Sequence, residues 1–146
     1  SESTEKKLNG LLEKSFDAEQ GFKKAAENVK SNSLKDFFMS KAEERLNFRN
    51  ELRREIAANG CDIKEHNGSI TGSLHRTWMD TKTLFSSDNE ESMLEEVRNG
   101  EKAALNDYNN VLEDKLLPPT TTSILKKQRN AIQSSYDKAD YLEGAL

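Results

Sequence analysis

Polar side chains stand at positions where the hydrophobic pattern of this chain calls for apolar ones. Glu19, for example, lies three residues from Phe16 and three from Phe22. Four more polar residues interrupt apolar stripes in the same way: Arg45, Glu101, Gln128 and Tyr136. A buried carboxylate is costly unless it is paired, protonated or bound to a metal. The residue types therefore predict either a buried ion-pair layer built on Arg45 or a metal or redox centre that uses Glu19 and Glu101.

Five helical segments are predicted to position these residues. Apolar residues recur mostly three and four apart, which is typical of amphipathic helices. The segments cover residues 3–30, the stretch from the break at 31–33 to residue 59, and residues 69–85, 89–116 and 121–142. Tight loops join the first two and the last two segments, so each pair should form an antiparallel hairpin. Two hairpins joined by a long crossover that contains a short helix predict an all-α, ferritin-like four-helix bundle, as a single domain over residues 1–146.

The hairpin loops also predict which polar residues share a level of the bundle. If the first loop centres near Asn32, Glu19 and Arg45 are each thirteen positions from it and face each other. If the second loop centres between Pro118 and Pro119, Glu101 pairs with Tyr136. These two pairs would form one central polar layer, with Gln128 nearer the second loop.

The composition narrows the classes of function. The chain has 146 residues, 26 acidic against 22 basic, and a formal net charge of −4, which disfavours nucleic acid as a partner. It contains no run of about 18 apolar residues, so no membrane span is expected. The single cysteine, Cys61, excludes an internal disulfide and favours a reducing, cytoplasmic location. Whether a leader is removed before Ser1 is a question that the sequence leaves open.

Three segments carry a resemblance to a known family. They are GFKKAAE (Gly21–Glu27), GSITGSLHRTWMD (Gly68–Asp80) and NGEKAALNDY (Asn99–Tyr108). Together they resemble an uncharacterised bacterial family of ferritin-like four-helix-bundle proteins that is related to the rubrerythrin-type di-iron bundles. The middle segment is the most specific, with His75, Arg76 and Trp78 on the crossover helix.

The resemblance implies a metal site that has lost most of its ligands. Such bundles hold two iron ions with four carboxylates and two imidazoles. Glu19 and Glu101 occupy two ligand positions, whereas Ala42 and Arg45 stand where a Glu-x-x-His pair is expected.

Three functions follow as alternatives. The first is a non-catalytic, stress-associated or interaction protein without a cofactor. The second is an iron-binding protein or metal-dependent oxidoreductase with an unconventional site on Glu19 and Glu101. The third is a binder of membrane surfaces or small apolar ligands through Trp78. A homodimer is also an expectation, and the sequence identifies no protein partner.

Overall fold

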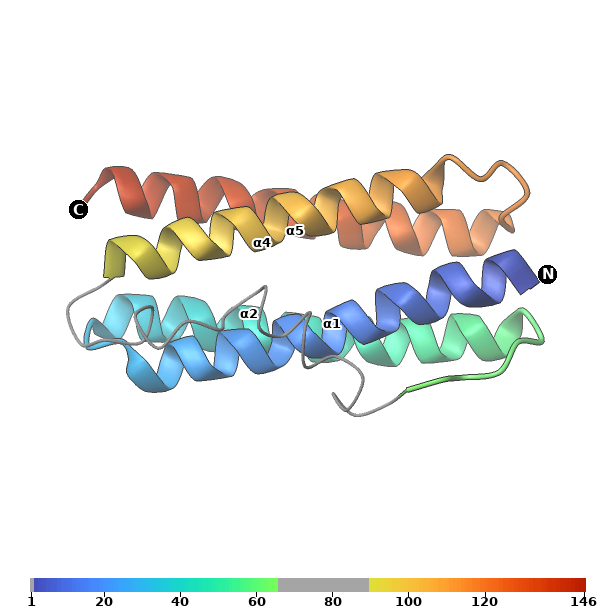
Figure 1. Cartoon of the computed structure of the whole chain (residues 1–146), viewed down its shortest axis with the longest axis horizontal. Coiled ribbons are helices and arrows are strands. Elements are labelled where there is room, and N and C mark those ends of the chain that lie inside the picture. The colour runs from blue at the N-terminus through green and yellow to red at the C-terminus, as the bar shows by residue number, and fades with distance from the viewer. Residues whose placement is uncertain (1, 66–89) are drawn as a thin grey trace.

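The described part of the chain forms four long helices that run along one axis (Figure 1). The computed structural model describes residues 2–65 and 90–146. The helices are α1 (Glu2–Asn28), α2 (Asn32–Ala58), α4 (Glu90–Leu112) and α5 (Pro119–Gly144), and the described residues contain no strand. An all-α four-helix bundle, as predicted, is thus confirmed in the described residues. The helix expected over residues 69–85 lies outside the described residues.

Local chemistry explains where the helices begin and end. The Ser31 hydroxyl caps α2 by accepting a hydrogen bond from the Leu34 N–H at 3.3 Å. Pro119 occupies the first position of α5, where its missing N–H costs no hydrogen bond. Helix α4 ends at Leu112, four residues earlier than predicted. There the Asp114 carboxylate accepts from the Leu116 N–H at 2.9 Å and stabilises a turn in place of another helical turn.

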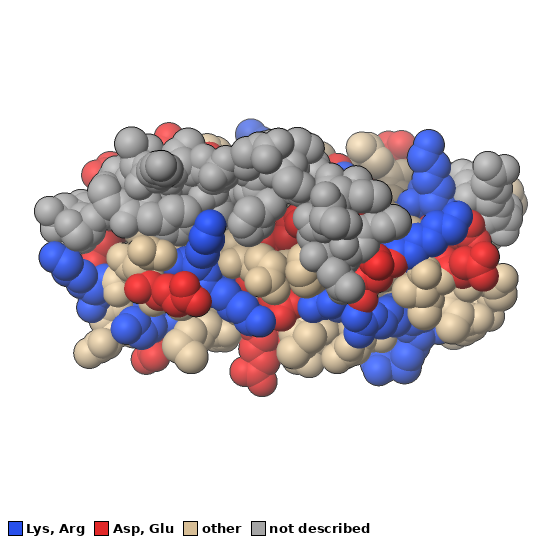
Figure 2. Space-filling model, turned by 60° about the horizontal axis from the view of Figure 1, so that its bottom comes forward, with Lys and Arg blue, Asp and Glu red and all other residues tan. Residues whose placement is uncertain are grey.

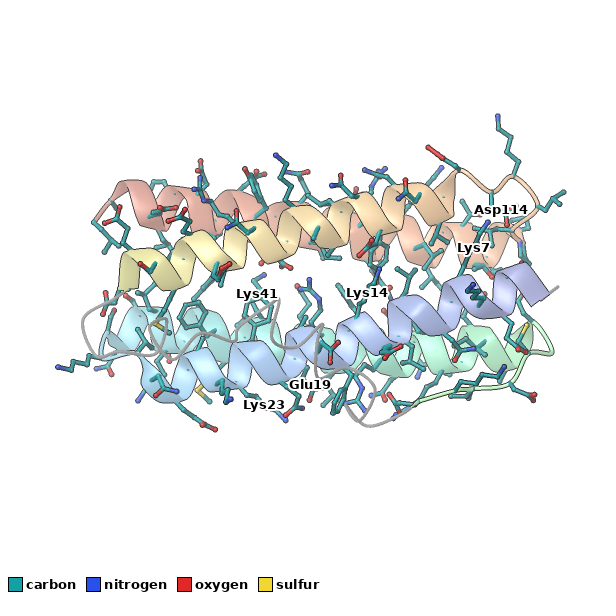
Figure 3. All side chains as sticks on the ribbon, viewed as in Figure 1. Lys7, Lys14, Glu19, Lys23, Lys41 and Asp114 are labelled. Atoms are coloured by element: carbon teal, nitrogen blue, oxygen red, sulfur yellow. The ribbon has the colours of Figure 1, made fainter. Side chains whose placement is uncertain are left out.

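The two hairpins, α1–α2 and α4–α5, lie side by side (Figure 1). Two ion pairs join α1 to the second hairpin: Lys7 to Asp114 at 3.3 Å and Lys14 to Asp107 at 2.8 Å (Figure 3). The two lysines are seven residues apart on α1, and their aspartate partners are also seven residues apart. The residue numbers rise along α1 and fall along the second hairpin. Helices α1 and α4 are therefore antiparallel neighbours.

The apolar core consists of two clusters along the bundle axis. The first contains Phe22, Phe38 and Val97, and the second contains Leu12, Leu52 and Ile132. Along α2 and α4 the change from one cluster to the other occurs at buried charged residues, which the next subsection describes. No helix of residues 2–65 and 90–146 combines the length and the apolar character that crossing a membrane requires.

Candidate functional site

Arg45 of α2 and Glu101 of α4 form an ion pair in the middle of the bundle. The Arg45 Nη1 donates to Glu101 Oε2 at 3.0 Å, and Nη2 donates to Oε1. Arg45 is 2% exposed and Glu101 is fully buried. One guanidinium thus binds both oxygens of one carboxylate, which is the strongest geometry for such a pair.

The surroundings of this pair favour its charged form. The Arg45 Cζ lies 5.6 Å from the centre of the Phe22 ring and 5.4 Å from that of Phe48, so aromatic faces flank the guanidinium. Burial by itself lowers the pKa of Arg45, but the charge and hydrogen bonds of Glu101 more than offset it and raise the pKa above its ordinary value. The guanidinium therefore stays protonated beside Glu101.

A second buried polar group lies nearer the α4–α5 loop. The Tyr108 hydroxyl donates to Gln128 Oε1 at 2.6 Å, and the Gln128 Nε2 donates to Glu51 Oε1 at 3.0 Å. Burial raises the pKa of the Tyr108 phenol above its ordinary value of 10.0, although the charge of Arg45 opposes this shift. Gln128 thus lies at the level of Tyr108, where the position of the second loop places it, and both side chains stay neutral.

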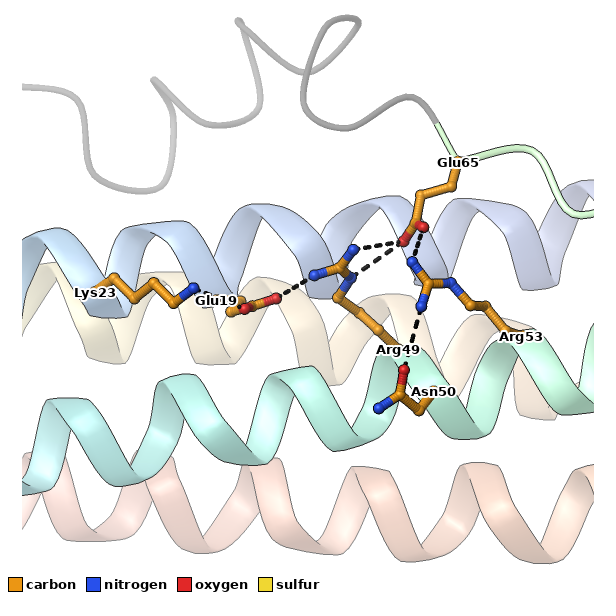
Figure 4. A network of polar contacts seen from close by, with 6 residues as sticks. All are labelled: Glu19, Lys23, Arg49, Asn50, Arg53 and Glu65. Carbon is orange, nitrogen blue, oxygen red and sulfur yellow. Dashed lines mark hydrogen bonds and ion pairs between the residues drawn. The ribbon is translucent and has the colours of Figure 1, made fainter.

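Glu19 does not face Arg45, which corrects one prediction. Its Oε1 accepts from the Arg49 Nη1 at 2.5 Å, and its Oε2 lies 3.1 Å from the Lys23 Nζ (Figure 4). Side chains on a helix tilt toward the N-terminus of that helix. In this hairpin, the side chains of α1 tilt away from the loop and those of α2 tilt toward it. An α1 side chain therefore meets an α2 residue that lies farther from the loop than the backbone level indicates. The partner of Glu19 is for this reason one turn beyond Arg45.

Arg49 continues this contact into a network that reaches the segment after α2. The Arg49 Nε donates to Glu65 Oε2 at 3.1 Å, and Arg53 binds the other oxygen of Glu65 (Figure 4). The Phe16 ring lies 4.6 Å from the Arg49 Cζ. Burial raises the pKa of Glu65, but hydrogen bonds from Arg53 and Arg49 outweigh it and lower the pKa below its ordinary value. Sequence reasoning missed this network, although Arg49 and Arg53 are one turn apart on α2.

Tyr136 is not the partner of Glu101, which corrects a second prediction. Tyr136 is half-buried, whereas Ser135 beside it is fully buried. The buried stripe of α5 continues from Ile132 to Ser135 and Ala139, so Tyr136 lies one position off that stripe. The predicted single layer is therefore two separate ion pairs, Arg45–Glu101 and Arg49–Glu19. The motif of His75, Arg76 and Trp78 lies outside the described residues.

The described donor set does not fit a di-iron site. Glu19 and Glu101, the two expected ligands, each bind a different arginine. In residues 2–65 and 90–146, no three His, Cys, Asp or Glu side chains come together in a way that could hold a metal ion. A cavity of about 250 Å³ between α1 and α4 does reach Arg45 and Tyr108, and Ala18, Gly100 and Ala104 are among its walls. At its inner end the cavity is thus lined by the cation of the buried ion pair, Arg45.

Comparison with known proteins assigns the chain to a family. Residues 3–114 match the family described as a domain of unknown function, DUF2383. The chain belongs to this family. No curated protein matches it in sequence. Among solved structures, it is similar to Mycobacterium smegmatis Dps in its tetragonal form, with a TM-score of 0.74 and 16% sequence identity. The match covers 95% of this chain and 87% of the Dps chain.

At this sequence identity, the likeness to Dps shows the fold alone. The expected family of ferritin-like bundles without an assigned function is confirmed. The relation of DUF2383 to rubrerythrin stays a prediction.

Proposed function

We propose that this DUF2383 protein is a non-catalytic, stress-associated or interaction protein in which an internal ion pair stands where a metal centre would be. One observation carries the proposal: the Arg45 guanidinium binds both oxygens of the buried Glu101. A carboxylate held in this way has its charge neutralised and both of its oxygens engaged. The bundle then serves as a rigid scaffold, and its surfaces rather than its centre provide the function.

Electrostatics supports this proposal against iron binding at the same place. A metal ion bound by Glu101 would displace Arg45 and leave an unpaired guanidinium in a buried site beside a divalent cation. Removing one partner of a buried pair costs about 3–5 kcal/mol. Repulsion between the metal and Arg45 would add to that cost, because charges interact more strongly away from water.

The alternative metal-dependent oxidoreductase would need Glu19 and Glu101 to act on one site. Each of these carboxylates pairs with its own arginine, and Lys23 adds a second cation beside Glu19. No contact in the described residues joins the two carboxylates to each other. This alternative therefore has no observation in its favour, and we do not put it forward.

Elemental analysis tests the proposal. The protein is purified without chelators or affinity metals, assayed for iron, manganese and zinc, and assayed again after anaerobic loading with ferrous ion. We expect far less than one metal per chain in both samples. As a matched control, Arg98→Met removes an α4 arginine that pairs with Asp140 and Glu143 near the surface, and it should give the same result. Stoichiometric iron that is lost in both Glu19→Ala and Glu101→Ala would overturn the proposal.

A further inference from the structure

The cavity of about 250 Å³ between α1 and α4 has a wall that is mostly apolar and built from small residues. On α4 these residues are Gly100, Ala103 and Ala104, and on α1 the wall includes Ala18. The side chain of Ile132, which is fully buried, lies at the inner end. Because the residues on both helices are small, neither helix fills the space between them.

Three polar groups at this wall already have partners within the protein. The Arg45 guanidinium binds its buried carboxylate, and the Tyr108 hydroxyl donates to Gln128 Oε1 at 2.6 Å. Nearer the surface, the Lys14 Nζ lies 2.8 Å from the Asp107 carboxylate. A water molecule held inside a protein needs about two to four polar partners. These three groups do not need such a water, because their partners are supplied by other side chains.

The charges at the wall disfavour a charged ligand of either sign. Arg45, which is 2% exposed, would repel a cation at the inner end of the cavity. Asp17, which is 3% exposed and also lines the cavity, would repel an anion. A charged ligand would in addition lose its hydration on entering. An uncharged molecule meets neither penalty.

The outer face of the neighbouring hairpin differs from this cavity. Figure 2 turns α1 and α2 toward the viewer, and Lys and Arg side chains lie there among Asp and Glu side chains. A surface of mixed charge is well hydrated and gives an apolar molecule little reason to leave water. An apolar molecule gains more in the cavity between α1 and α4, because the burial of apolar area is favourable.

We propose that this cavity binds one small, uncharged, mainly apolar ring compound. An engineered apolar cavity of about 150 Å³ holds benzene, so in proportion about 250 Å³ holds about ten non-hydrogen atoms. Asn99 and Ala103 at the rim are exposed on α4, and the ligand can therefore enter from solvent while the bundle stays closed. The site rests on the shape and charges of the cavity and does not depend on the proposed function.

Three probes of similar size test the class of ligand. They are benzyl alcohol, which is uncharged, benzoate, which is an anion, and benzylammonium, which is a cation. Each is titrated into the protein while the amide chemical shifts are followed by NMR. We expect benzyl alcohol to give saturable shifts in residues 14–18 and 99–108, which line the cavity on α1 and α4. The two charged probes should bind with dissociation constants at least about tenfold higher.

Filling the cavity tests the site. Ala104→Leu places a larger apolar side chain in the wall, so it should raise the dissociation constant of benzyl alcohol about tenfold or more. Its melting temperature should stay the same or rise, because filling a cavity commonly stabilises a protein. Ala57→Leu is the matched control: it makes the same change at an exposed position of α2 and should leave binding unchanged. Ala103→Leu narrows the rim from an exposed position without entering the core, and it should also weaken binding.

Three results would overturn the proposal. They are the absence of saturable shifts at these amides up to the solubility of benzyl alcohol, a charged probe that binds as tightly as benzyl alcohol, and unchanged binding in both Ala104→Leu and Ala103→Leu. In the first case, the cavity holds only water. These readouts are separate from the metal analysis, so failure here leaves the proposed function standing.

Discussion

Replacing Arg45 with methionine should lower the stability of the bundle severely. Methionine keeps an unbranched, flexible chain in the space between Phe22 and Phe48, so the substitution removes mainly the charge and the hydrogen bonds. Glu101 would then be a fully buried carboxylate without its partner. Breaking a buried pair in this way costs about 3–5 kcal/mol.

The expected shift of the melting temperature follows from the length of the chain. Unfolding entropies per residue give about 0.3 kcal/mol per kelvin for 146 residues. A loss of about 3–5 kcal/mol thus lowers the melting temperature by about 10–16 °C. Because small domains are stable by about 5–15 kcal/mol in total, the variant should still fold at low temperature.

The double variant Arg45→Met/Glu101→Leu makes this prediction sharper. With both charges gone, the site becomes an apolar layer, and the free energy of unfolding should return to the wild-type value or exceed it by about 1–4 kcal/mol. Urea unfolding followed by circular dichroism at pH 7 measures four proteins: the wild type, Arg45→Met, Glu101→Leu and the double variant. The reasoning is refuted if Arg45→Met changes stability by less than about 0.5 kcal/mol, or if the two single effects simply add in the double variant.

Two pH-dependent predictions follow from the other polar groups. The pKa of Glu65 is lowered by Arg53 and Arg49, so its contribution to stability is present above the ordinary pKa of 4.5 and is lost as the pH falls below it. Acid unfolding should show Glu65→Gln losing less stability than wild type over that range, and equal losses would contradict the network of Figure 4. Burial raises the pKa of Tyr108, so stability should fall as the pH rises above 10.0, and Tyr108→Phe should reduce this fall. In native protein at pH 10.0, phenolate absorbance should be equal in wild type and Tyr108→Phe; a lower value in the variant would show that Tyr108 ionises.

The sequence predicted the bundle because its signals are local and repeat over many residues. Apolar positions three and four apart define the buried faces, and the break at residues 31–33 marks where the second helix begins. The same logic identified Glu19, Arg45, Glu101 and Gln128 as buried, since each interrupts an otherwise apolar stripe. Whether a position is buried depends on which face of a single helix it occupies. The spacing of apolar residues along the sequence defines that face.

The partners of these residues were harder to predict because they depend on two helices at once. The backbone levels of the α1–α2 hairpin put Glu19 opposite Arg45, but the tilt of both side chains moves the contact to Arg49. Along α5, a shift of one residue decides whether Ser135 or Tyr136 is buried. Glu65 gave no signal, since it follows α2 in a segment without helical periodicity.

The most direct test of the central claim is a crystal structure of the protein grown with ferrous ion under anaerobic conditions, with diffraction data collected at the iron absorption edge. The account predicts the Arg45 guanidinium on both oxygens of Glu101 and no anomalous peak within bonding distance of that carboxylate. An anomalous peak bound to Glu101, with Arg45 turned away from it, would contradict the account.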